Sequence, residues 1–102
     1  MIRLFHWNQS EVANLIFKIK ANGFEVDHST FKSSQIKELA RRPPQAVVID
    51  LSRLPSQGRD LAANLLQYKS LQNTPFVFID GDEEKLPRVK RIFPHAVYAR
   101  SE

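Results

Sequence analysis

Hydrophobic and polar residues follow two patterns that alternate along the chain. Short runs are apolar at nearly every position, and between them lie longer stretches in which apolar residues recur at helical spacing. The first pattern is typical of strands in a parallel sheet, which are covered on both faces. The second is typical of amphipathic helices. Their regular alternation predicts βαβ units built around one parallel sheet.

Five segments carry the strand pattern. We expect strands at residues 2–7, at the short run 24–26 and at residues 96–99. Residues 46–49, Ala-Val-Val-Ile, and residues 76–79, Phe-Val-Phe-Ile, are apolar throughout. These two runs predict the central strands, because a central strand of such a sheet has no solvent-facing side.

Four segments carry the helical pattern. We expect helices at residues 9–21, between Ser33 or Ser34 and the pair Pro43-Pro44, at residues 59–70, and at about residues 86–93. Gly23 supplies the left-handed residue that ends the first helix, and Pro87 fits only the first turn of the last one. The core positions predicted on the first three helices are Val12, Leu15, Ile16, Ile19, Ile36, Leu39, Ala40, Leu61, Leu65, Leu66 and Tyr68.

The order of these elements predicts one domain over residues 1–102. Parallel strands joined by right-handed crossovers favour a flavodoxin-like α/β fold, a doubly wound five-stranded parallel sheet in the order 2-1-3-4-5 with four helices. Functional groups of such folds gather at the carboxyl ends of the strands. The candidate site residues are therefore His6, Trp7, Asp50, Asp80 and Arg100.

Composition narrows the choice of function. The formal net charge is +4 and cysteine is absent, which excludes a disulfide framework, a thiol nucleophile and a thiolate metal site. Lys and Arg are spread along the chain instead of forming a stripe, so a basic nucleic-acid-binding α/β domain is only an alternative. No run approaches the roughly 20 apolar residues of a membrane span, and the N-terminus lacks a signal-peptide pattern. We expect a cytoplasmic protein without a membrane partner.

Several short motifs resemble one family when they are taken in order. Residues 22–26, Asn-Gly-Phe-Glu-Val, are similar to a turn into a second strand, and residues 47–51, Val-Val-Ile-Asp-Leu, resemble a third strand ending in a phospho-accepting aspartate. Further matches are Gly58, eight residues after Asp50, Leu54-Pro55, which stands one position late, and residues 74–79 before and in the fourth strand. From Ile2 through Arg100 the chain resembles a CheY-like response-regulator receiver domain, a module of phosphorelay signal transduction.

The resemblance implies a site in which only one signature residue is kept. Asp50 is equivalent to the phosphoacceptor, whereas the acidic pair that holds Mg²⁺ in receivers falls on His6 and Trp7. The family's Thr or Ser becomes Asp80, and its lysine becomes Arg100. Mg²⁺ needs oxygen ligands with carboxylate charge, so we expect no bound metal, no cofactor and no enzymatic activity. Asp50 then acts as a cap or an ion-pair partner, and we expect Arg100 to pair with Asp50, Asp80 or both.

Other site chemistries have weaker support in the sequence. His6, His28 and His95 lack the spacing of zinc ligands, although His6 and His28 are predicted to end adjacent strands. Trp7 can stack a base, but a tryptophan at a strand end more often closes a core. Residues 80–84 resemble a calcium loop only in composition, and hydrolase and nucleotide-binding motifs are absent.

The leading functional expectation is a phosphorylation-independent protein-interaction module. The family's output face, the fourth helix and fifth strand, here carries Arg88, Lys90, Arg91, Tyr98 and Arg100, which suits an acidic protein partner. One alternative is a receiver still phosphorylated or ligand-switched at Asp50, and the other is nucleic-acid binding. Receivers normally carry a fifth helix, which the sequence ending at Glu102 lacks. We therefore expect a second copy, as a homodimer, or the rest of a longer chain to cover one face of the sheet.

Overall fold

The computed structural model describes residues 1–7, 9–28, 34–52 and 55–100. It is an α/β fold of flavodoxin-like arrangement, with one all-parallel five-stranded sheet in the predicted order β2-β1-β3-β4-β5. The elements in chain order are β1 (Ile2–Phe5), α1 (Gln9–Ala21), β2 (Val26–His28), α2 (Ser34–Arg41), β3 (Ala46–Asp50), α3 (Pro55–Leu66), the 3-10 turn η1 (Lys69–Leu71), β4 (Phe76–Ile79), α4 (Leu86–Ile92) and β5 (Val97–Ala99).

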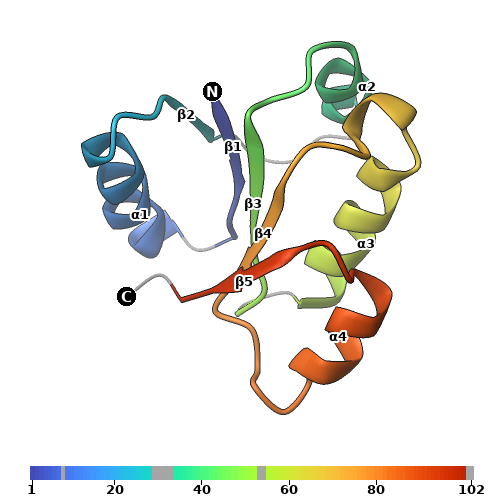
Figure 1. Ribbon diagram of the computed structural model, residues 1–102. Helices are drawn as coiled ribbons and strands as arrows, with labels where there is room; N and C mark the ends of the chain where they lie inside the picture. The colour runs from blue at the N-terminus through green and yellow to red at the C-terminus, as the bar shows by residue number, and fades with distance from the viewer. Residues whose placement is uncertain (8, 29–33, 53–54, 101–102) are drawn as a thin grey trace.

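The helices divide unequally between the two faces of the sheet (Figure 1). Helix α1 lies alone on one face, and α2, α3 and α4 lie on the other. Alternate strand residues point to opposite faces, so Leu4 and Val48 pack with α1, whereas Phe5, Ile49 and Phe78 join the larger core under α3. The continuous apolar runs account for a core on each face of the sheet, because a strand that is apolar at every position places apolar side chains on both faces.

The positions at which helices begin and end agree with the sequence in α1, α2 and α4. Helix α1 has the predicted bounds, and Gly23 after it has a φ of 88°, the left-handed conformation that terminates a helix with little strain. Pro87 lies in the first turn of α4 as predicted. The predicted capping residue Ser33 lies outside the described residues, and α2 begins at Ser34 and ends before the proline pair.

Other element bounds differ from those predicted. Strand β2 covers Val26–His28 instead of residues 24–26, because the turn at Gly23 leaves Phe24 exposed and pairing with β1 begins only where Ile2 donates its amide to the Glu25 carbonyl. Strands β1 and β5 are also shorter than expected.

Helix α3 covers Pro55–Leu66 instead of residues 59–70. Proline at the first helical position favours the earlier start, since it lacks only an amide that would be unsatisfied there. Three residues later, Gly58 packs so closely on β3 that an added Cβ would lie 2.9 Å from Leu51 Cδ2 and 3.1 Å from the Asp50 carbonyl oxygen. This contact fixes the height of α3 beside the end of β3.

A buried arginine in β1 was not predicted. Arg3 is 3% exposed, and its guanidinium donates to Asp27 Oδ2 at 2.7 Å and to Gln35 Oε1 at 3.0 Å while lying over the Phe5 ring. The two terminal nitrogens thus have hydrogen-bond partners, which offset part of the cost of burying this charge.

Over the residues described, the helices are too short or too polar to cross a bilayer.

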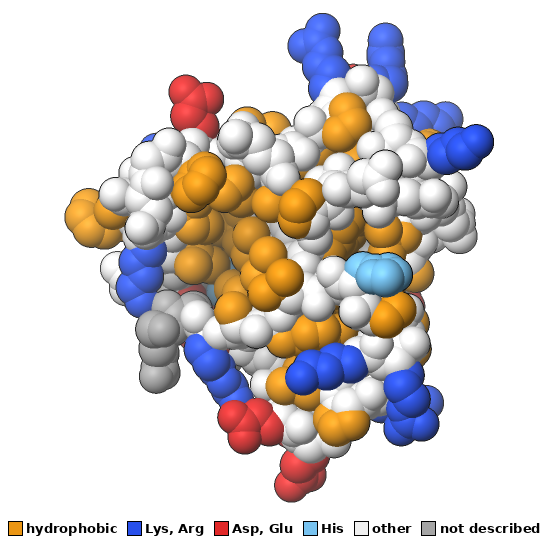
Figure 2. All heavy atoms as spheres, in the orientation of Figure 1, with side chains coloured by type: hydrophobic (Ala, Val, Ile, Leu, Met, Phe, Trp, Pro, Cys, Tyr) orange, Lys and Arg blue, Asp and Glu red, His pale blue; other side chains and the backbone are white. Residues whose placement is uncertain are grey.

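The face that carries α1 is incompletely covered. Val48 and Ile79 are buried there, whereas Val77 is only half-buried and Val97 is 54% exposed. Figure 2 shows the resulting group of hydrophobic side chains between α1 and β5.

Candidate functional site

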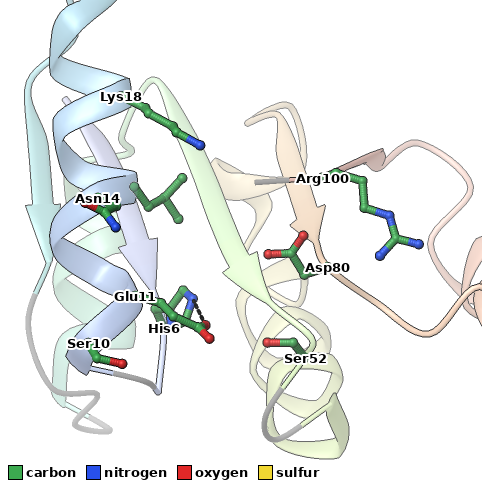
Figure 3. A pocket seen from close by; sticks show the side chains of 9 residues that line it. His6, Ser10, Glu11, Asn14, Lys18, Ser52, Asp80 and Arg100 are labelled. Atoms are coloured by element: carbon green, nitrogen blue, oxygen red, sulfur yellow. Dashed lines mark ion pairs between the residues drawn. The ribbon is translucent and has the colours of Figure 1, made fainter. Parts of the chain in front are cut away.

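The carboxyl ends of four strands meet at one edge of the sheet. His6 follows β1, Asp50 ends β3, Asp80 follows β4, and Arg100 follows β5, which brings predicted site residues to one region. A cavity of about 470 Å³ opens there between α1 and the strand ends (Figure 3). Its lining residues are His6, Ser10, Glu11, Asn14, Leu15, Lys18, Ser52, Asp80 and Arg100.

The Asp50 carboxylate is buried beneath this cavity and is engaged by the chain that follows it. Its Oδ1 accepts hydrogen bonds from the Ser52 amide at 3.1 Å and from the Ser52 hydroxyl at 2.6 Å. An aspartate bonded to the backbone two residues ahead is a common way to fix a turn. Asp50 is 0% exposed, so this carboxylate organises the exit from β3 without facing solvent.

His6 occupies the space beside Asp50. Its Nε2 lies 3.8 Å from Asp50 Oδ1 and 3.6 Å from Glu11 Oε2, while its side chain is only 2% exposed. When the imidazole is protonated, it therefore bridges two carboxylates from different elements. His28 Nε2 lies 3.4 Å from the His6 carbonyl oxygen, as expected for the ends of the adjacent strands β1 and β2.

One carboxylate oxygen at this site has no hydrogen-bond partner among the described residues. Asp50 Oδ2 is fully buried, and such an atom carries a desolvation penalty. A metal ion is one way to compensate a buried carboxylate, yet the described residues contain no group of three or more His, Asp or Glu side chains arranged to hold one. The donor set at the site, one imidazole and dispersed carboxylates, does not resemble the oxygen cage that Mg²⁺ needs.

Asp80 adopts an unusual backbone conformation at the end of β4. Its φ is 57°, in the left-handed region that Asp tolerates better than most residues, and its amide donates to the Ala99 carbonyl at 3.1 Å. The carboxylate faces the cavity and adds negative charge to its floor (Figure 3).

The predicted pairing of Arg100 with Asp50 or Asp80 is wrong. The guanidinium of Arg100 pairs with Glu83 in the loop after β4 and points away from Asp80 (Figure 3). Arg100 leaves the outermost strand, so Glu83 is within reach, whereas Asp50 lies two strands away beneath the cavity. Both side chains of the pair are more than half exposed, so its contribution to stability is small.

The surface of α4 and β5 carries the other predicted site residues. Arg88, Lys90 and Arg91 are exposed on α4, and the Lys90 ammonium lies 5.5 Å from the centre of the Tyr98 ring. The Tyr98 hydroxyl donates to the Phe93 carbonyl at 3.3 Å, and partial burial raises the pKa of this phenol above its ordinary value of 10.0. Trp7, placed at the site by sequence, instead packs half-buried against the larger core.

Sequence reasoning missed the cavity-lining side chains of α1, among them Glu11, Asn14 and Lys18. Residues three, four or seven apart share one side of a helix, but only the packing of α1 decides which side faces the cavity. The bonding of Ser52 to Asp50 could have been predicted from the sequence, since a serine two residues after an aspartate is a frequent turn pattern.

Comparison of the sequence with models of known families found no match, and comparison with curated proteins found none either.

Proposed function

We propose that this domain is a cytoplasmic, receiver-like protein-interaction module that acts without phosphorylation. The observation that carries the proposal is the environment of Asp50, a fully buried carboxylate bonded to Ser52 beside the His6 imidazole. In the receiver domains that the sequence resembles, an acidic side chain at the position of His6 holds the metal ion that assists phosphoryl transfer. Without that charge stabilisation the transfer loses most of its assistance.

The arrangement around Asp50 also opposes phosphorylation sterically. A phosphoacceptor must present an oxygen to its donor, but Asp50 is 0% exposed and does not line the cavity. Asp80 lines it instead and would repel an incoming phosphoryl dianion. Phosphorylation at Asp50, the alternative function, thus requires that a buried Asp50 oxygen become exposed and that the phosphoryl group bind beside the negative charge of Asp80.

A mass measurement tests this part of the proposal. We expect no adduct after the protein is incubated with acetyl phosphate and Mg²⁺ and its intact mass is recorded under cold, mildly acidic conditions, in which acyl phosphates survive. The matched control is Asp50→Asn, which keeps the size of the side chain but removes the acceptor. A stoichiometric phosphate adduct on the natural sequence that disappears in this variant would refute phosphorylation independence.

The interaction surface we propose is α4 together with β5. It combines exposed basic residues, Arg88, Lys90 and Arg91, with the aliphatic side chain of Ile92, which is 59% exposed. Basic groups around exposed apolar groups suit an acidic protein partner. Nucleic acid is the alternative ligand for such charge, and it is distinguished by affinity that falls steeply with salt and does not depend on the apolar side chains.

The second part of the proposal concerns the half-covered face beside α1. The apolar side chains of Val77 and Val97 remain accessible there, and a parallel sheet is normally covered on both faces. We propose that a second copy of this chain, in a twofold dimer, covers them. The rest of a longer chain is the alternative cover.

A further inference from the structure

The outer edge of β5 ends the sheet with unpaired backbone groups. Strand β5 pairs with β4 on one side and is the last strand in the order, and no described strand pairs with its other side. The Ala99 carbonyl accepts from the Asp80 amide and so points toward β4. Because neighbouring residues in a strand direct their backbone groups to opposite sides, the amide and carbonyl of Tyr98 point outward.

We propose that the edge of β5 binds an extended segment of an acidic partner as an added strand. This inference rests on the proposed function as an interaction module and names the contact that the module uses. An added strand satisfies the outward amide and carbonyl of Tyr98, and its side chains alternate between the two faces of the sheet. The two faces beside β5 differ in chemistry, and this difference sets the sequence pattern that fits.

The face on the α4 side is hollowed and carries the Lys90 ammonium. A cavity of about 180 Å³ lies beside Tyr98, and its lining includes Lys90 together with Arg100 and Glu83, which pair with each other. An acidic side chain of the added strand reaches the Lys90 ammonium here, while the opposite face offers the exposed side chain of Val97. Because side chains alternate along a strand, the fitting segment alternates acidic and aliphatic residues.

Charge argues for a partner segment over a second copy at this edge. Pairing of β5 with β5 of another copy would bring Lys90 and the neighbouring Arg91 of the two copies together, which is unfavourable when like charges lie across from one another. An acidic segment gains from the same positive charges. Figure 1 shows β5 in front of the other strands, with α4 beside it and its outer edge uncovered by any described helix.

The first test uses amide hydrogen exchange of the full chain, measured by NMR. The probe is a short acetylated peptide of alternating glutamate and valine, and the control peptide has lysine in place of glutamate. We expect the Tyr98 amide to become protected with the first peptide only. Changes confined to α4, with the Tyr98 amide unprotected, would overturn edge pairing while leaving the interaction module intact. Equal effects of both peptides, or of a single-stranded oligonucleotide, would also overturn it.

The second test separates the backbone amide from the ring. Tyr98→Ala and Tyr98→Pro both remove the aromatic side chain, but only proline removes the outward amide, and proline is tolerated where the missing amide faces away from the sheet. We expect Tyr98→Pro to bind the peptide roughly tenfold more weakly than Tyr98→Ala. Equal binding by two folded variants would refute the proposal, and if either variant is unfolded, the exchange experiment on the natural sequence decides. Protection of the Tyr98 amide that rises with protein concentration alone would identify a second copy as the occupant and would also refute it.

Discussion

The Nε2 atom of His6 lies 3.8 Å from Oδ1 of Asp50, and both side chains are withdrawn from solvent. The contact joins the ends of two neighbouring strands, β1 and β3, through an imidazole and a carboxylate. Asp50 is therefore part of a local structural network with His6 and Ser52.

Asp50 should matter for stability through its bonds to Ser52. Asp50→Ala leaves the Ser52 amide without its acceptor, whereas Asp50→Asn keeps an oxygen in the same place. We expect Asp50→Ala to lower the free energy of unfolding by about 2 kcal/mol more than Asp50→Asn does, because the alanine variant leaves the Ser52 amide and hydroxyl without their acceptor. Urea denaturation of both variants measures this difference. Equal losses would show that the turn does not depend on the Asp50 oxygen.

The buried guanidinium of Arg3 should not tolerate exchange for lysine. Two of its nitrogens donate to Asp27 and Gln35 from fixed positions in one plane, which the single nitrogen of lysine does not reproduce, and the guanidinium lies 4.7 Å from the centre of the Phe5 ring. We expect Arg3→Lys to destabilise the fold by about 1–3 kcal/mol. Arg100→Lys, at a half-exposed pair, is the matched control and should change stability by less than about 0.5 kcal/mol. Thermal unfolding that ranks the two substitutions the other way would contradict the role given to Arg3.

Tyr98 should make the protein less stable in alkali. Burial raises the pKa of its phenol, so the folded state holds the proton more tightly than the unfolded state does. The stability that Tyr98 contributes is fully present below pH of about 10, where the unfolded phenol titrates, and it is lost as the pH rises through the folded pKa. We expect the free energy of unfolding of Tyr98→Phe to fall less between pH 9 and 11 than that of the natural sequence. Identical slopes would show that the phenol ionises equally in both states.

The half-covered face beside α1 should be the contact of a dimer. We expect light scattering at micromolar concentration to give twice the mass of the chain, because the apolar side chains around Val77 and Val97 gain from being covered. Val97→Lys should shift the mass to that of a monomer. Ile92→Lys is the matched control, since Ile92 is exposed to a similar extent but lies on α4, across the sheet from α1. A stable monomer of the natural sequence would refute a twofold dimer on this face.

Sequence alone determined the framework of the protein. The runs at residues 46–49 and 76–79 are apolar at every position, and only a central strand between two layers uses such a run, so their place in the sheet followed from the pattern. The handedness of crossovers then fixed the strand order. Asp50, His6 and Asp80 consequently fell at one edge, as expected from the shared direction of parallel strands.

Tertiary structure decided what those side chains touch. Arg100 pairs with Glu83, not with Asp80, because the folded path of the loop after β4 brings Glu83 beside the end of β5, and local spacing does not encode this path. Strand β2 and helix α3 shifted by several residues because pairing with β1 and the close approach of Gly58 to Asp50 outweigh local preference. Arg3 is charged, which indicates a surface position, and it is buried only because Asp27 and Gln35, distant in sequence, converge on it. Periodicity records which face of an element is apolar, whereas the pairing of polar groups depends on separations that exist only after the chain has folded.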